Sequence, residues 1–115
     1  MFKKLRSAIY QVSDMQKATA WYINITGTQP YFNESFYVGF DIGGFELGLH
    51  PGEAAIAKNQ ALAYWKVDNI ETAVKKLVDA GAVVIEQIAE VGGGTKVASV
   101  KDPWGNAVGL IEESN

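Results

Sequence analysis

Two stretches of the chain repeat one order of apolar and polar positions. Each stretch opens with a short run that favours a strand, and then changes to an apolar spacing of three and four, which favours an amphipathic helix. The pattern therefore predicts two helices that each pack one face on a sheet. Their apolar stripes are Met15, Ala18, Trp21, Tyr22 and Ile25 in the first helix and Ile70, Ala73, Val74, Leu77 and Val78 in the second.

Polar residues and glycines mark the expected helix ends. Each helix is expected to begin at a capping box, in which two side chains satisfy each other's backbone N–H groups. Gly27 and Gly81 follow the two stripes, where C-terminal caps belong. The two capping pairs are Ser13 with Gln16 and Asp68 with Glu71.

The two halves of the chain are predicted to be one structural unit, used twice. Residues 7–18 align with residues 62–73, and residues 41–50 align with residues 102–111. After each helix, runs rich in β-branched and aromatic residues predict three strands, and Gly43-Gly44 and Trp104-Gly105-Asn106 predict hairpin turns. The expected strands are 29–33, 36–41 and 45–50 in the first half and 82–87, 95–101 and 107–112 in the second.

The resulting expectation is an α+β fold of two tandem βαβββ units within one domain, residues 1–115. The first unit covers about residues 5–50, residues 51–60 form a linker, and the second unit covers about residues 61–113.

Composition limits the chemistry that this fold can carry. The chain has 115 residues and 48% apolar content, which suits one domain that buries about two-thirds of its unfolded surface. It has no cysteine and one histidine, which excludes disulfides, thiolate nucleophiles and cysteine-based zinc sites.

Charge and hydropathy narrow the partners and the location. The net charge is −3 and the cations are scattered, which argues against a nucleic-acid partner. No apolar run approaches the roughly 18 residues of a membrane span, and the first residues lack the pattern of a signal peptide. We expect a soluble cytoplasmic protein that does not bind membranes.

Two segments carry a resemblance to a known family. Residues 12–22, Val-Ser-Asp-Met-Gln-Lys-Ala-Thr-Ala-Trp-Tyr, with the following Gly27, resemble the strand-to-helix opening of the vicinal oxygen chelate superfamily. Residues 101–113, Lys-Asp-Pro-Trp-Gly-Asn-Ala-Val-Gly-Leu-Ile-Glu-Glu, resemble its closing hairpin. The superfamily contains glyoxalase I, bleomycin resistance proteins, extradiol dioxygenases and fosfomycin resistance enzymes, so the resemblance is more specific for fold than for reaction.

The resemblance implies a curved mixed sheet around a cleft, which a second chain completes in a homodimer. It also implies, for members that use a metal, one ligand on the first strand and one on the last strand of each unit. These slots fall here on Ser7, Gly48, Leu62 and Gly109. Leucine and glycine offer no side-chain donor and a lone serine is a poor one, so we expect no metal and no cofactor.

A register shift of two residues leaves a metal-binding alternative open. Glu46 and His50 share one strand face with Gly48, so both side chains are able to point into the cleft and bind a metal with help from elsewhere. In the other interpretation, His50 is half solvated beside Pro51, and Glu46 is a cleft carboxylate or a surface charge.

A period of two along the first and last strands of each unit gives the expected cleft lining. It is mainly apolar and aromatic, with a few polar groups, as in pockets for organic ligands. Lys66 is expected opposite Glu46, as an ion pair or as a separate ligand contact. The candidate ligand-binding residues are Ser7, Gln11, Glu46, His50, Leu62, Tyr64, Lys66, Trp104 and Gly109.

Three positions along the expected cleft have two interpretations each. Glycine at 48 and 109 either enlarges the cleft or relieves crowding between strands. Trp104 is either a stacking surface at the cleft mouth or part of a packed hairpin lid.

Three functional hypotheses follow. The first is a metal-independent, dimeric small-molecule binding protein that resembles the bleomycin resistance proteins and holds an aromatic or cationic ligand, an antibiotic being one possibility. The second is a divergent metal-dependent lyase, epimerase or dioxygenase that uses Glu46 and His50. The third is a regulatory or interaction module whose cleft is buried in the dimer.

Overall fold

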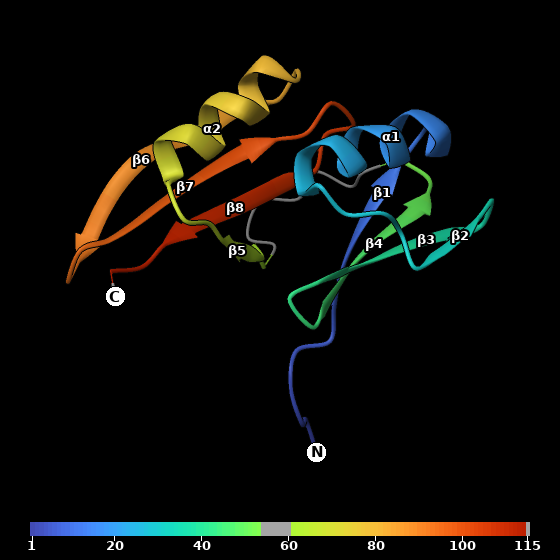
Figure 1. The fold of residues 1–115 in the computed structure, drawn as a ribbon, viewed down its shortest axis with the longest axis horizontal. Helices are drawn as coiled ribbons and strands as arrows, with labels where there is room; N and C mark the ends of the chain where they lie inside the picture. The colour runs from blue at the N-terminus through green and yellow to red at the C-terminus, as the bar shows by residue number, and fades with distance from the viewer. Residues whose placement is uncertain (54–60, 115) are drawn as a thin grey trace. The chain divides into compact units, whose positions relative to one another are not determined.

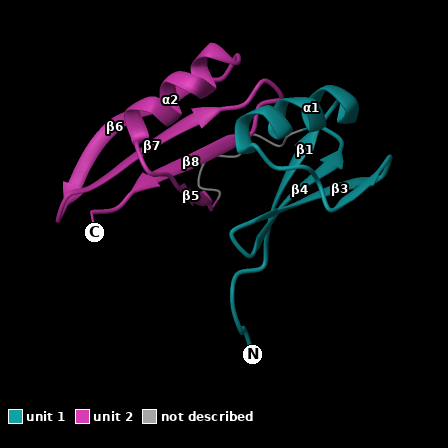
Figure 2. Cartoon of the chain, in the orientation of Figure 1, with its two compact units in different colours: residues 1–54 teal, residues 55–115 magenta. Residues whose placement is uncertain are grey.

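The computed structural model of the chain describes residues 1–53 and 61–114. These divide into two compact units, Met1–Ala54 and Ala55–Asn115, called unit 1 and unit 2 (Figure 2). Each unit has the order strand, helix, strand, strand, strand, which confirms the predicted α+β class and the tandem βαβββ repeat. Pro51 of the expected linker ends a strand, and residues 54–60 of it lie outside the described residues.

Unit 1 has one helix and one four-stranded sheet (Figure 1). The strand order is β1-β4-β3-β2, with β1 parallel to β4 and the other neighbours antiparallel. The elements are β1 (Ser7–Val12), α1 (Met15–Thr26), β2 (Phe32–Glu34), β3 (Tyr37–Ile42) and β4 (Phe45–Pro51).

The core of unit 1 lies between α1 and one face of this sheet. Along β1, Tyr10 and Val12 are buried whereas Ile9 and Gln11 are exposed, which confirms the predicted alternation. The ring of Tyr10 stacks on that of Tyr22 in α1 with 6.0 Å between centroids. The opposite face of the sheet, called the open face of unit 1, therefore carries the side chains that alternate with the core.

Unit 2 repeats this arrangement with the strand order β5-β8-β7-β6. Ile70 and Leu77 of its helix are buried, but Val78 is 42% exposed, so the predicted stripe is wrong at its last position. The elements are β5 (Tyr64–Lys66), α2 (Ile70–Asp79), β6 (Val83–Gly92), β7 (Thr95–Lys101) and β8 (Ala107–Glu112). As in unit 1, the face away from the helix is the open face of unit 2.

Both helices begin one residue later than the capping boxes predict. Asp14 is the N-cap of α1 and accepts a hydrogen bond from the Lys17 N–H at 3.0 Å. Asn69 is the N-cap of α2 and accepts from the Thr72 N–H at 2.9 Å. Asp14 and Asn69 are both extended, and a side-chain acceptor satisfies a free N–H of the first turn only from that position.

The predicted C-terminal cap is confirmed for α1 and displaced for α2. Gly27 has φ 68° and donates its N–H to the Ile23 carbonyl at 2.9 Å, in the left-handed conformation that favours glycine. In α2 the cap is Ala80, and Gly81 follows it.

Candidate functional site

The open face of unit 1 places the residues of three strands in rows. Ser7 of β1 is in register with Glu46 of β4, and Glu46 is in register with Asp41 of β3. In the next row, Gly48 lies between Ile9 and Gly39. The parallel pairing of β1 with β4 therefore brings the beginning and the end of the unit together.

Glu46 is the centre of a hydrogen-bonded cluster on this face. Its side chain is almost buried, although it belongs to the face away from the core. Its Oε1 accepts from the Tyr37 hydroxyl at 2.7 Å, the Ser7 hydroxyl at 2.8 Å and Arg6 Nη1 at 2.9 Å. Its Oε2 accepts from the Tyr31 hydroxyl. We call these five residues the Glu46 cluster.

The cluster fixes the protonation states of its members. Burial opposes the charge of Glu46, but hydrogen bonds from Tyr31, Tyr37, Ser7 and Arg6 outweigh it and lower its pKa to about 2. Burial and the bond to Glu46 raise the pKa of Tyr37 to about 12. At neutral pH the carboxylate is charged and Tyr37 keeps its proton, so Glu46 is a weak base and Tyr37 a poor acid.

Two glycines make room for this cluster. A Cβ atom at Gly48 would lie 2.1 Å from the Tyr37 hydroxyl oxygen, and one at Gly39 would lie 2.9 Å from Glu46 Oε2. Real Cβ atoms do not approach so closely, so Tyr37 and Tyr31 occupy the space that side chains at 48 and 39 would need.

Gly109 has the equivalent place in unit 2. It is in register with Tyr64 on one side and Ser99 on the other. A Cβ atom there would lie 2.7 Å from the Ala63 carbonyl oxygen and 2.8 Å from the Tyr64 ring. At both glycines a neighbouring group fills the space, so the crowding interpretation fits and the enlargement interpretation does not.

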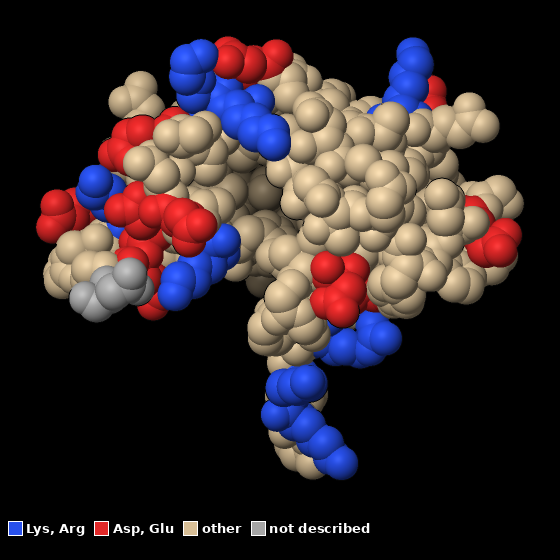
Figure 3. All heavy atoms as spheres, viewed as in Figure 1, with Lys and Arg blue, Asp and Glu red and all other residues tan. Residues whose placement is uncertain are grey.

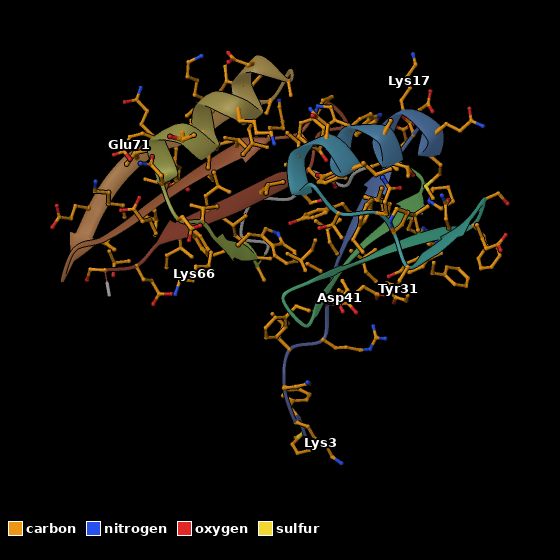
Figure 4. All side chains as sticks on the ribbon, in the orientation of Figure 1. Lys3, Lys17, Tyr31, Asp41, Lys66 and Glu71 are labelled. Carbon is orange, nitrogen blue, oxygen red and sulfur yellow. The ribbon has the colours of Figure 1, made fainter. Side chains whose placement is uncertain are left out.

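A pocket opens beside the Glu46 cluster, where the segment before β1 meets the β3–β4 hairpin. Its volume is about 340 Å³, at the small end of the range for ligand sites. Figure 4 shows Asp41 and Tyr31 on the side of the sheet away from α1. The lining residues are Lys4, Arg6, Tyr31, Asp41, Gly44, Phe45 and Glu46. We call this the N-terminal pocket.

Aromatic side chains continue along the β2–β3 hairpin. The ring centroid of Phe32 is 5.9 Å from that of Phe36 and 6.3 Å from that of Tyr37. Tyr31 and Phe36 are exposed by 59% and 62%. This end of unit 1 therefore presents an aromatic surface next to a fixed charge pair.

Four of the predicted site residues lie on the open face of unit 1, in two groups. Ser7 and Glu46 are bonded to each other, whereas Gln11 and His50 form a register pair at the other end of β1 and β4. Four residues of extended strand separate the Cα atoms of Glu46 and His50 by about 13 Å. At this separation the structure does not bring the two side chains to one point, and the Tyr37 hydroxyl lies over the intervening Gly48.

The other five predicted residues belong to unit 2. Tyr64 contacts Gly109, Lys66 is in register with Ile111, Leu62 precedes β5, and Trp104 lies in the β7–β8 turn. Within unit 1 the cation that contacts Glu46 is Arg6, at 2.9 Å, and the suggested contact of Lys66 with Glu46 stays a prediction. A role in ligand binding stays a prediction for all nine residues.

The sequence did not predict three members of the Glu46 cluster, Arg6, Tyr31 and Tyr37. Tyr37 alternates with Gly39 and Asp41 along β3, so a period of two was the available signal for it. Arg6 immediately precedes β1, and its carbonyl already accepts the Glu46 N–H at 2.8 Å. Tyr31 precedes β2, and no periodicity indicates the direction of its side chain.

The described residues give few donors for a metal ion. In residues 1–53 and 61–114 no three His, Asp or Glu side chains gather as a possible ligand set. Of the four family slots, two are covered glycines, one is Leu62, and Ser7 donates its hydroxyl to Glu46. This donor set does not fit a divalent ion. In the same residues, neither α1 nor α2 has the length and hydropathy needed to cross a bilayer.

The sequence matches one family model, Glyoxalase/Bleomycin resistance protein/Dioxygenase superfamily, over residues 4–110. No curated protein matches the chain at a significant level. A solved glyoxalase/bleomycin resistance protein/dioxygenase family enzyme from Burkholderia phytofirmans PsJN is similar, with 19% identity over 97% of this chain and 100% of that chain and a TM-score of 0.81.

Two other solved structures share the fold. The fosfomycin resistance protein FosX from Mesorhizobium loti has 13% identity over 99% of this chain and 95% of its own, with a TM-score of 0.77. The lactoylglutathione lyase from Agrobacterium tumefaciens has 19% identity over 95% and 92%, with a TM-score of 0.72. At such identities the likeness concerns architecture, because one scaffold carries many reactions.

Proposed function

The chain belongs to the glyoxalase, bleomycin resistance protein and dioxygenase superfamily, and from this premise we propose that it is a metal-independent small-molecule binding protein resembling the bleomycin resistance proteins. It holds an aromatic or cationic organic ligand and does not transform it. The observation that carries the proposal is the Glu46 cluster, in which protein donors already use the carboxylate that a metal would need.

The geometry around Glu46 opposes metal binding in a specific way. A metal ligand needs an oxygen lone pair directed at the ion, but Oε1 accepts three hydrogen bonds and Oε2 accepts one. An ion that binds Oε1 has to displace charge-assisted bonds, which are among the strongest in proteins. These bonds support a site without a metal.

The aromatic surface supports the class of ligand. Tyr31, Phe36 and Phe45 are exposed by 59%, 62% and 43%, which leaves ring faces accessible for stacking. A cation over such a ring gains about 0.5–1 kcal/mol at an exposed site. The net charge of −3 also favours the approach of cations.

The first experiment measures metal and ligand together. Protein purified without chelator is analysed for metal content, and its thermal unfolding is then recorded with a library of aromatic and cationic compounds, antibiotics included, with and without EDTA. We expect less than about a tenth of an equivalent of metal and ligand-induced stabilisation that EDTA leaves unchanged. A full equivalent of metal, with stabilisation lost in EDTA, would contradict the proposal.

A full equivalent of metal, with stabilisation lost in EDTA, is the outcome expected from the alternative function. A metal-dependent lyase, epimerase or dioxygenase using Glu46 and His50 requires both side chains on one ion, although about 13 Å of strand separates their Cα atoms. A loss of metal in both Glu46→Gln and His50→Ala would favour the enzyme.

A variant pair tests the aromatic surface. Phe45→Ala removes an exposed ring of unit 1 that lines the N-terminal pocket, and we expect ligand affinity to fall by about 2- to 5-fold. The matched control is Val91→Ala, which removes a side chain that is 61% exposed on β6 of unit 2. Equal affinities in the two variants would place the ligand elsewhere.

We also propose a homodimer in which the partner chain contributes to the ligand site. The exposed apolar side chains of unit 1, with Ile9 at 56% and Phe36 at 62%, support an interface. If these side chains were covered in the dimer with no ligand binding at all, the chain would instead be an interaction module. The cytoplasmic location stays a prediction.

A further inference from the structure

The N-terminal pocket combines charges that the cluster does not use. Arg6 and Glu46 neutralise each other in its lining, with 2.9 Å between Nη1 and Oε1. Two further charged groups line it, the Lys4 ammonium and the Asp41 carboxylate. Figure 3 shows basic and acidic atoms close together on unit 1, where the N-terminal segment leaves it.

Neither of these two groups is neutralised within the described part of the chain. Asp41 Oδ1 accepts the Gly44 N–H of the hairpin turn at 2.9 Å, while its Oδ2 has no hydrogen-bond or ion-pair partner among residues 1–53 and 61–114. Within the same residues the Lys4 ammonium also has no such partner. One wall of the pocket thus offers a free acceptor and another a free donor of opposite charge.

The remaining walls are aromatic. Phe45 is 43% exposed and Tyr31 is 59% exposed, and both line the pocket with Lys4 and Asp41. Tyr31 is fixed by its hydroxyl bond to Glu46, so its ring presents a preorganised surface. A volume of about 340 Å³ accommodates a compact ligand with one ring.

We propose that the N-terminal pocket is a subsite for a zwitterionic ligand, one that carries an ammonium group and a carboxylate beside an aromatic body, as an aromatic amino acid does. The ammonium pairs with Asp41, the carboxylate pairs with Lys4, and the ring packs on Phe45 and Tyr31. This inference rests on the proposed function and names the chemistry of its ligand.

Charge balance favours a zwitterion over a ligand with one charge. A simple amine gains an ion pair with Asp41 but is repelled by Lys4. A simple carboxylate gains an ion pair with Lys4 but is repelled by Asp41. A ligand with both charges gains from both groups and leaves the pocket neutral. Discrimination between ligands therefore depends on matching two charges, each with its own protein partner.

The experiment uses three probes, L-phenylalanine, phenethylamine and 3-phenylpropionate. They share a phenyl ring and the same chain length, and they differ in carrying an ammonium group, a carboxylate or both. Each is titrated into full-length, C-terminally tagged protein and followed by amide chemical shifts in two-dimensional NMR. We expect L-phenylalanine to bind at least about 3-fold more tightly than either analogue, with shifts concentrated at residues 41–46.

Charge-neutral variants assign each contact. Lys4→Gln is expected to remove the tighter binding of L-phenylalanine relative to phenethylamine. Asp41→Asn is expected to remove the tighter binding of L-phenylalanine relative to 3-phenylpropionate. Asparagine keeps an Oδ1 acceptor for the Gly44 N–H, so the turn is retained. The matched controls are Lys3→Gln and Glu34→Gln, two exposed charges of unit 1 that do not line the pocket.

Two results overturn this inference in distinguishable ways. If phenethylamine binds as tightly as L-phenylalanine and Lys4→Gln changes neither, the ligand is a simple cation and the proposed function stands without the zwitterion. If none of the three probes shifts residues 41–46 while other compounds of the library bind, the N-terminal pocket is not the ligand subsite.

Discussion

Glu46 is a buried carboxylate on the strand face that points away from the core. It lies on the open face of unit 1, where a carboxylate ordinarily faces water, yet its side chain is only 10% exposed because Tyr31 and Tyr37 close over it. Sequence periodicity placed Glu46 and Ser7 in the same expected cleft lining, and the structure joins them by a hydrogen bond. The reach of a tyrosine side chain across a sheet depends on its rotamer, which periodicity does not contain.

The low pKa of Glu46 predicts a pH-dependent contribution to stability. The folded-state pKa of about 2 lies below the ordinary value of 4.5, so the charged cluster stabilises the fold fully above about pH 4.5. This stabilisation is lost as the pH falls towards 2. We expect the difference in Tm between wild type and Glu46→Gln to be largest at neutral pH and to shrink over this window.

Differential scanning calorimetry at several pH values between 2 and 7 provides the measurement. Glu34→Gln serves as the control, because Glu34 is exposed on β2 and has no part in the cluster. A difference between wild type and Glu46→Gln that stays constant across the range would show that the charge of Glu46 contributes nothing.

The contact between Gly48 and Tyr37 makes a second prediction at the residue scale. Gly48→Ala places a Cβ atom 2.1 Å from the Tyr37 hydroxyl oxygen, so Tyr37 must move and release Glu46. We expect the free energy of unfolding in urea to fall by about 1–3 kcal/mol.

A double-mutant cycle assigns this loss. In a Tyr37→Ala background the obstructing ring is absent, so Gly48→Ala is expected to cost about 1 kcal/mol less than in wild type. Equal costs in both backgrounds would mean that the destabilisation comes from the strand itself and not from Tyr37.

At the scale of elements, the sequence predicted which segments are helices and strands but was less accurate at their ends. The strand 95–101 and the strand 107–112 agree with β7 and β8 at both ends. β6 instead continues to Gly92, beyond the expected residue 87, because register shifts keep it paired with β7. Pairing between strands extends an element past the point where its own composition predicts an end.

The helix starts give a prediction that separates the two capping positions. Asp14→Ala and Asn69→Ala each remove a side-chain acceptor for a first-turn N–H, and each is expected to cost about 1 kcal/mol. Ser13→Ala and Asp68→Ala, at the positions that the sequence favoured, are expected to have little effect. Thermal unfolding of the four variants decides between the two capping positions. If Ser13→Ala lost as much stability as Asp14→Ala, and Asp68→Ala as much as Asn69→Ala, the observed assignment would be refuted.

At the scale of the whole molecule, repetition made the fold predictable. Alignment of the two halves indicated the βαβββ order before any contact was known, and both units have it. The site was less accessible to such reasoning, because the halves differ where the chemistry lies. In the rows through Gly48 and Gly109, Ile9 of unit 1 corresponds to Tyr64 of unit 2, and Gly39 corresponds to Ser99.

The proposed homodimer is tested on the intact chain. Light scattering after size exclusion is expected to give a mass near twice 12.5 kDa. Phe36→Lys places a charge on the exposed apolar surface of unit 1 and is expected to shift the mass towards that of one chain. Val91→Lys on β6 is the control, and a single-chain mass for the wild type would contradict the dimer.

The two covered glycines also constrain how this protein can change in evolution. A ligating side chain at Gly48 would collide with the Tyr37 hydroxyl, and one at Gly109 would collide with the Ala63 carbonyl oxygen and the Tyr64 ring. The covering tyrosines come from different strands, β3 and β5, so each unit follows its own route. A metal-ligating side chain at either glycine therefore needs compensating substitutions within its own unit, and the single-substitution intermediates are expected to be destabilised.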